Sequence, residues 1–150
     1  MLKGYKYRIY PNQEQRTYFA KTFGCTRFIY NRMLGDKISH YEQTHEMLKN
    51  TPAHYKDKFP WLKEVDSLAL ANAQLDLQTA YGNFFRDPNV GFPNFKKKTN
   101  DKSYTTNNQK GTVYIENGYV KIPKLKSMIK IKQHRQFEGL IKSCTISQTP

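Results

Sequence analysis

The chain has 150 residues, and its 25 lysine and arginine residues against 12 aspartate and glutamate residues give a formal net charge of +13. This charge exceeds what solubility requires and predicts a polyanionic partner. Aromatic residues make up 14% of the chain, and neither a long apolar run nor a signal-peptide pattern is present, so the composition favours nucleic acid over a membrane and predicts a soluble, cytoplasmic protein.

The positive charge is concentrated in the second part of the chain. Residues 1–90 hold 13 basic and 9 acidic side chains, whereas residues 91–150 hold 12 basic and 3 acidic ones. The two cysteines, Cys25 and Cys144, belong to no CxxC pair, and the four histidines lack the spacing of metal ligands. The sequence therefore predicts neither a zinc site nor a disulfide.

The first predicted element is a β-strand over residues 2–10 (LKGYKYRIY), which Pro11 ends. Alternation along this strand places Tyr5, Tyr7 and Ile9 on one face. The opposite face carries Lys6, Arg8 and Tyr10.

Helical patterns follow. Asn12 and Gln15 form a capping-box pattern that opens a helix over residues 12–23, Gly24 predicts a turn, and a second helix is expected over residues 26–46.

The linker after the second helix contains prolines and predicts a short helix from Thr51, with Trp61 anchoring the linker to the core. Asp66 predicts the N-cap of a third helix over about residues 67–85. This helix is apolar on two adjacent sides, which predicts central packing. The two stripes are Leu70, Ala73, Leu77, Tyr81 and Phe84, and beside them Leu68, Ala71 and Leu75.

Residues 87–102 contain glycine, prolines and a lysine triplet, and they predict a basic loop. Asn117-Gly118 between residues 112–116 and 119–122 predicts a β-hairpin, because both turn positions need a positive φ. Further strands are expected over residues 128–132, with Lys130 and Lys132 on one face, and over residues 140–147.

An isolated sheet would expose its edges, so closure with the N-terminal strand into a small barrel is the economical arrangement. The predicted fold is α+β: a small antiparallel β-barrel with three helices inserted after the first strand.

Several segments of the chain together resemble the N-terminal half of the TnpB/OrfB family. They are YKYRIYPNQEQ leading to FGCTRFIYNRML, then FPWLKEVDSLALANAQLDLQTAYGNFFR, then GFPNFKKK, SYTTNN and VKIPKL. Members of this family are transposon-encoded, RNA-guided DNA endonucleases, often labelled transposases with a helix-turn-helix start. The resemblance implies that residues 1–11 and 103–150 form an oligonucleotide-binding-like barrel, the wedge domain. Residues 12–86 would form the helical recognition lobe and residues 87–102 a basic loop.

The resemblance also implies that the nuclease chemistry lies beyond this chain. In the family, a RuvC-like domain holds magnesium with three carboxylates and contains a CxxC zinc ribbon, and we expect both metals to belong to a missing C-terminal part. In the basic half of this chain the acids are Asp101, Glu116 and Glu138, each isolated, so solvated structural roles are expected for them. We therefore expect no catalytic residue, no metal site and no cofactor in this chain.

Two sets of candidate contacts follow. Basic side chains that could neutralise RNA phosphates are Lys6, Arg8, Arg27, Arg32, Lys96, Lys97, Lys98, Lys130 and Lys132. Residues at positions that read a DNA motif in the family are Ser67, Asn72, Tyr104, Asn107, Asn108 and Gln109, and amide side chains suit base edges. The structural alternatives are an ordinary solvated face for the basic residues, a polar position on a partly exposed helix for Asn72, a turn for Asn107 and Asn108, and a core or rim position for Tyr104.

The expected partners are a guide RNA from the transposon end and the target DNA, bound by a monomer in the prokaryotic cytoplasm beside the nucleoid. One alternative is a dimeric helix-turn-helix regulator whose helix pair would place Arg27, Asn31 and Arg32 in a major groove. A second is a ribosome-associated protein that binds double-stranded RNA by shape.

Overall fold

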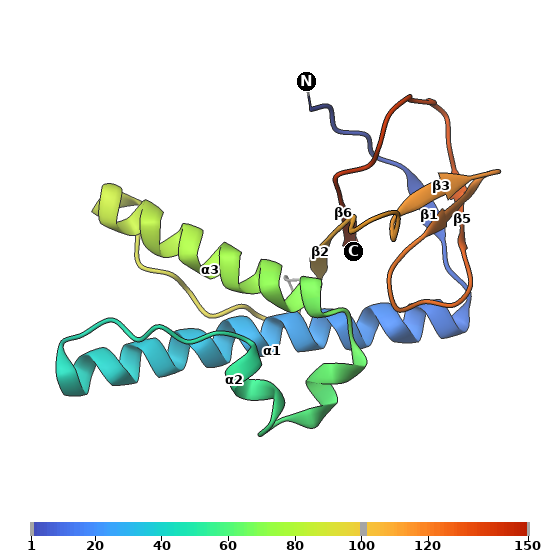
Figure 1. Ribbon diagram of the computed structural model, residues 1–150. Coiled ribbons are helices and arrows are strands. Elements are labelled where there is room, and N and C mark those ends of the chain that lie inside the picture. The colour runs from blue at the N-terminus through green and yellow to red at the C-terminus, as the bar shows by residue number, and fades with distance from the viewer. Residues whose placement is uncertain (1, 100–101, 150) are drawn as a thin grey trace.

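The computed structural model describes residues 2–99 and 102–149, in which a helical unit adjoins two small antiparallel sheets (Figure 1). The α+β class is therefore confirmed. The elements in chain order are β1 (Arg8–Tyr10), α1 (Gln13–Thr44), α2 (Ala53–Lys56), the 3-10 helix η1 (Pro60–Glu64), α3 (Ser67–Arg86), the 3-10 helix η2 (Pro88–Val90), β2 (Ser103–Asn107), β3 (Tyr114–Glu116), β4 (Tyr119–Lys121), β5 (Ile129–Lys132) and β6 (Ser143–Ser147).

The two helices expected on either side of Gly24 are one helix, α1, so the predicted turn is wrong. The residues flanking Gly24 are buried, and the hydroxyls of Thr22 and Thr26 donate to the helix's own carbonyls of Tyr18 and Phe23. A break here would leave buried backbone groups unpaired, which costs more than the roughly 1 kcal/mol that a glycine costs inside a helix. The capping box of Asn12 and Gln15 is confirmed at the N-terminus.

Two hydrophobic cores lie along α1. The first half of the helix contributes Phe19 and Phe23 to a core beneath the sheets, together with Val120, Ile129 and Ile146. The second half packs against α3 in a helical core. The fully buried residues of that core are Ile29, Met33, Leu34, Leu62, Val65, Leu70 and Leu77.

The strands do not close into the expected barrel. Among the described residues they form a four-stranded sheet in the order β1-β5-β4-β3 and a separate pair, β2-β6. The edge of β2 opposite β6 faces α3, where the Asn72 side-chain amide donates to the Thr105 carbonyl oxygen at 3.0 Å. A helix thus covers the edge that another strand would have to occupy.

The N-terminal strand is expected over residues 2–10, but β1 comprises only Arg8–Tyr10. These are the residues that pair with β5. The hairpin is confirmed: Asn117 and Gly118 have φ values of 51° and 79° between β3 and β4. The strand expected over residues 128–132 is confirmed as β5. The strand expected over residues 140–147 is shorter than predicted, because β6 begins at Ser143.

In the helical unit, α3 is confirmed with Asp66 as its N-cap, and the predicted short helix is α2. The second apolar stripe of α3 is not buried, because Leu75 is 54% exposed. Trp61 is also 43% exposed and lies over Phe28 and Phe59, so the linker is anchored by fully buried Leu62. Within residues 2–99 and 102–149, none of the helices combines the length and apolar character that crossing a membrane requires.

Asp66 joins the helical unit to the sheets, and this joint predicts the effect of a mutation. One carboxylate oxygen accepts from the Leu68 amide at 3.0 Å as the α3 cap, and the other accepts from the buried Thr106 hydroxyl in β2. Asp66→Ala removes the cap and leaves the Thr106 hydroxyl unpaired, so the free energy of unfolding should fall by about 2–4 kcal/mol. Urea denaturation followed by circular dichroism measures this. Asp57→Ala, at an exposed carboxylate, is the control and should change stability by less than about 0.5 kcal/mol. Equal stability of both variants would contradict the role of Asp66.

Candidate nucleic-acid interface

The outer face of the four-stranded sheet combines basic and aromatic side chains. Directly opposed residues of antiparallel strands point to the same face. Tyr10 of β1 is opposite Lys130 of β5, which is in turn opposite Tyr119 of β4. Arg8 is opposite Lys132 in the same way, two residues along the strands. The sequence predicts that Lys130 and Lys132 share a face of their strand, and that Arg8 and Tyr10 share a face of theirs. In the structure all four residues lie on the same exposed face of the sheet.

The aromatic rings on this face are half exposed. The exposed fractions are 45% for Tyr10, 44% for Tyr119 and 41% for Tyr114. Tyr114 of β3 is on the same face as Tyr119, because it is paired with Lys121, two residues along β4. The inward side chains of the same strands, Ile9, Ile129 and Ile131, fill the core. Burial of the inner face is thus complete without the tyrosines, whose rings remain available to a partner. We call these residues the aromatic-basic face: Arg8, Tyr10, Tyr114, Tyr119, Lys130 and Lys132.

Lys6 lies in the segment before β1, which packs on the segment after β5. The Tyr7 hydroxyl donates to the Arg135 carbonyl oxygen at 2.6 Å, and the Tyr5 ring stacks on Phe137 with 4.9 Å between centroids. Lys6 itself is exposed between these two anchored rings. Its side chain therefore extends the basic character of the face beyond the end of β1.

The lysine triplet is less free than a flexible loop would be. Asn31 of α1 both donates to the Lys96 carbonyl oxygen at 3.0 Å and accepts from the Lys96 amide at 2.7 Å. The Lys96 ammonium lies 4.6 Å from the centroid of the Tyr30 ring. Lys97 and Lys98 are exposed beside this anchor. The segment is thus held on α1 at Lys96.

The basic residues of α1 occupy different surroundings. Arg27 is half-buried. Arg32 Nε lies 3.6 Å from Asp36 Oδ2, and the Arg32 guanidinium lies over the Phe59 ring. Asp36 also accepts from the Tyr55 hydroxyl at 2.7 Å, and burial together with this bond raises the pKa of Tyr55 to about 12. Arg32 is therefore part of a structural network, and the amide of Asn31 is committed to Lys96. Two members of the set expected for a helix-turn-helix regulator, Asn31 and Arg32, thus have structural partners within the fold.

The candidate motif-reading amides Asn72 and Asn107 meet at the joint between α3 and β2. The Asn72 amide nitrogen donates to Asn107 Oδ1 at 2.8 Å, besides its bonds to the carbonyl oxygens of Leu68 and Thr105. Both side chains are half-buried, and Ser67 is exposed at the first turn of α3. Asn72 thus orients Asn107, whose own amide nitrogen has no acceptor within residues 2–99 and 102–149.

Two of the remaining three candidates, Asn108 and Tyr104, have structural roles in the fold. Asn108 donates to the Ile141 carbonyl oxygen at 2.7 Å, and its oxygen accepts from the amides of Gly111 and Val113. Gln109 is exposed in the turn that Asn108 organises.

The Tyr104 ring is 4% exposed between Phe19 and Phe23, and burial raises the pKa of its hydroxyl. Tyr104 is a core residue and is not positioned to stack on a base.

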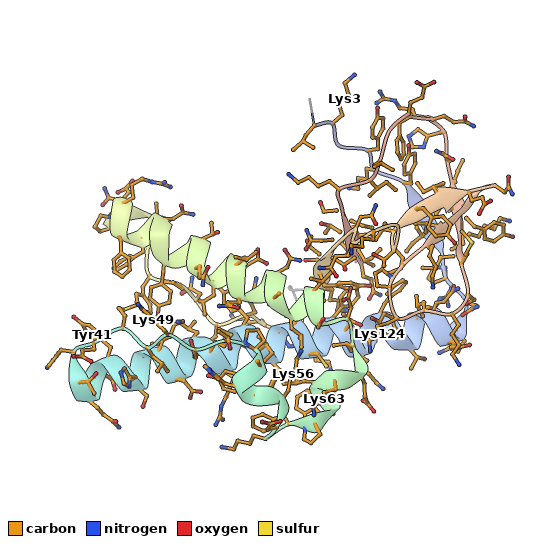
Figure 2. All side chains as sticks on the ribbon, in the orientation of Figure 1. Lys3, Tyr41, Lys49, Lys56, Lys63 and Lys124 are labelled. Atoms are coloured by element: carbon orange, nitrogen blue, oxygen red, sulfur yellow. The ribbon has the colours of Figure 1, made fainter. Side chains whose placement is uncertain are left out.

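Positive charge is spread over the whole molecule. Figure 2 shows Lys3 and Lys124 at the sheet end and Lys49, Lys56 and Lys63 along the helical unit. Charge alone therefore does not single out one surface, whereas the coincidence of half-exposed tyrosines with cations distinguishes the aromatic-basic face.

The described histidine, cysteine and acidic side chains are scattered over the fold. Within residues 2–99 and 102–149, no three histidine, cysteine, aspartate or glutamate side chains lie close enough to hold a metal ion. Asp101 lies outside the described residues. The cysteines are free thiols, and burial raises the pKa of Cys144 to about 11 and also raises the pKa of Cys25.

Sequence reasoning named none of the three tyrosines of the aromatic-basic face as a contact, although it placed Tyr10 on the face of Arg8, and it missed a cavity beside that face. Tyr119 and Tyr114 could have been found, because the Asn117-Gly118 turn fixes the register of the hairpin and hence the face of each residue. Placing Tyr10 next to Lys130 required the pairing of β1 with β5, which no local pattern determines. The cavity, of about 450 Å³, lies between the hairpin and residues 133–141, with amides of Asn117, Gln133 and Gln136 in its wall.

The sequence of the chain resembles a protein family and several known proteins. The family model HTH_OrfB_IS605, described as a helix-turn-helix domain, matches residues 1–46, a range that contains β1 and α1, although α1 is one helix without a turn. Along 99% of its length, the chain is 28% identical to "Putative RNA-guided DNA endonuclease InsQ" of Escherichia coli K12, of which it covers 38%. It is 31% identical over 67% of its length to "Putative RNA-guided DNA endonuclease" of Streptomyces pristinaespiralis, covering 27% of that protein.

A third relative is short. The chain is 33% identical over 65% of its length to "Virulence protein VsdF" of Salmonella dublin, and the match covers 95% of that protein. The chain thus spans well under half of the two endonuclease-named relatives and nearly all of this one. From the family model and these relatives together, the chain belongs to the TnpB/OrfB family and corresponds to its N-terminal region.

Proposed function

We propose that this chain is the nucleic-acid-binding part of a transposon-associated, RNA-guided DNA endonuclease, which holds the guide RNA and contacts the motif beside the DNA target. The observation that carries the proposal is the aromatic-basic face on a chain of charge +13 that aligns along 99% of its length with a relative named as such an endonuclease. Phosphate contacts supply affinity without sequence information, and aromatic rings accept bases of any sequence.

Within this proposal the two sheets take the role of the wedge domain, and residues 12–86 that of the recognition lobe. The wedge is open rather than a closed barrel, with β2 attached to α3 through Asn72 and Asp66. The joint between the two parts carries the polar side chains Ser67, Asn72 and Asn107, and we assign contact with the target-adjacent motif to this joint. The chain acts as a monomer on RNA and DNA in the cytoplasm, beside the nucleoid.

We assign binding rather than cutting to the described residues. A metal-dependent nuclease needs convergent carboxylates to hold its cations. Glu116 and Glu138 are exposed, and no set of three metal-ligating side chains occurs in the described parts of the chain. Magnesium-dependent, guide-directed DNA cleavage by this purified chain would overturn this assignment.

A salt series of affinities tests the RNA-binding role. The ligands are RNA from the transposon end, scrambled RNA of equal length and duplex DNA. The transposon RNA should remain bound at physiological salt, whereas the other two should lose most of their affinity, because nonspecific phosphate binding weakens steeply with salt. If all three affinities collapse together, the chain is a generic polycation. A twofold-symmetric footprint on duplex DNA would instead favour the helix-turn-helix regulator.

The basic residues of the sheet should account for part of that salt dependence. Arg8→Gln combined with Lys132→Gln removes two adjacent exposed cations. The slope of log affinity for transposon RNA against log salt should become shallower by about 1–2 units, since each lost phosphate contact removes about 0.7–0.9. Lys49→Gln with Lys63→Gln, two exposed lysines of the helical unit, is the charge-matched control. Equal effects of the two double variants would show that the sheet holds no special position.

Asn107 should matter for the DNA motif and not for RNA. Asn107→Ala removes an amide that Asn72 orients, so discrimination between target duplexes with and without the motif should fall by about 1–3 kcal/mol in the presence of guide RNA. Asn89→Ala, an exposed asparagine in η2, is the matched control. Competition binding measures the effect, and unchanged discrimination in the Asn107 variant would remove this residue from the interface.

A further inference from the structure

We propose that the aromatic-basic face binds unpaired nucleotides of the guide RNA, with bases stacked on Tyr10 and Tyr119 and phosphates neutralised by Arg8, Lys130 and Lys132. This inference rests on the proposed function and adds to it the kind of RNA segment that this face holds.

The spacing of the two tyrosines suits a single strand laid across the sheet. Tyr10 and Tyr119 lie on the strands that flank β5, and Lys130 stands between them in one cross-strand row. Neighbouring strands are about 4.8 Å apart, so the two tyrosines are about 10 Å apart at the backbone. Two bases can therefore occupy the two rings at once, with a cation between them.

The charges on the face define a direction for the phosphates. Arg8 of β1 and Lys132 of β5 form a pair two residues along the strands from the pair of Tyr10 and Lys130. Glu116 of β3 is paired with Tyr119 of β4, and it is the acidic residue among those paired on this face. On the β4 side, Lys121 donates through its Nζ to the Leu125 carbonyl oxygen. Phosphates are repelled by Glu116 and attracted by the β1 and β5 cations, so the backbone of the RNA runs over β1 and β5 while a base reaches toward Tyr119.

Stacking on these rings requires bases whose flat surfaces are free. In a duplex, neighbouring base pairs cover those surfaces, whereas unpaired loops and ends can splay their bases onto aromatic side chains. A face that held only duplex RNA would need cations and hydroxyl-reading groups, not three half-exposed tyrosines. The ring content of the face thus favours the single-stranded segments of a folded RNA.

The structural alternative is that the tyrosines stabilise the sheet through cross-strand pairing with lysines. The two explanations differ in what the ring contributes. Sheet stability depends on the bulk and β-propensity of the side chain, whereas stacking depends on its π-surface and its access to solvent.

The test compares Tyr10→Leu/Tyr119→Leu with Tyr10→Phe/Tyr119→Phe and with Tyr41→Leu. Tyr41 is 49% exposed at the C-terminal end of α1, far from the sheet, and serves as the exposure-matched control (Figure 2). The ligands are a short single-stranded RNA carrying 2-aminopurine, an RNA duplex of the same sequence, and RNA from the transposon end. Circular dichroism and a thermal melt check that each variant is folded.

The leucine double variant should bind the single strand about ten- to a hundredfold more weakly and lose the quenching of 2-aminopurine. The phenylalanine variant and Tyr41→Leu should bind like the wild type, and affinity for the duplex should not change. Weaker binding of the transposon RNA by the leucine variant is expected as well.

Three results would overturn the inference. These are an unchanged single-strand affinity in the leucine variant, an equal loss for the duplex, and a loss for the short strand with no loss for the transposon RNA. The last result would show a stacking surface that does not serve the guide. Failure of the proposed function is detected separately, with the wild-type protein and no variant. In that case the wild type would bind transposon RNA and scrambled RNA with equal affinity.

Discussion

The continuity of α1 is the constraint on which the rest of the structure depends. This helix has 32 residues and is about 48 Å long, and it contributes Phe19 and Phe23 to the core under the sheets and Ile29, Met33 and Leu34 to the core against α3. Because one rigid element belongs to both cores, the sheets and the helical unit have a defined position relative to each other (Figure 1).

The same constraint explains why the joint between α3 and β2 can combine structural and functional roles. Asp66 and Asn72 bond to β2 through Thr106 and Thr105, and these bonds occupy the edge at which a barrel would close. The open arrangement leaves Asn107 at the surface beside the start of α3. A polar joint of this kind is stable because its buried polar groups are hydrogen-bonded. The polar groups that these internal hydrogen bonds do not use are the ones that can contact a partner.

The proposed interface depends on a coincidence of two properties rather than on charge. Lysines occur all over the surface, and an exposed cation by itself indicates little about where RNA lies. On the four-stranded sheet, however, the inward isoleucines pack in the core, so the outward tyrosines lie between cations on strands that are ordered without burying them. Such preorganisation lowers the entropy cost of ordering side chains on binding.

By itself, the sequence determined the features that have local causes: the capping box at Asn12, the Asp66 cap of α3, the Asn117-Gly118 hairpin and the outward face of Lys130 and Lys132. These follow from hydrogen bonds and alternation within a few residues. Only the tertiary structure decided that Gly24 is helical, that Tyr104 is buried, that Leu75 is exposed, and that β1 pairs with β5 so that Tyr10 lies next to Lys130. Each of these depends on contacts between segments far apart in the chain, whose free energy outweighs the local preference, and such contacts leave no pattern within one segment.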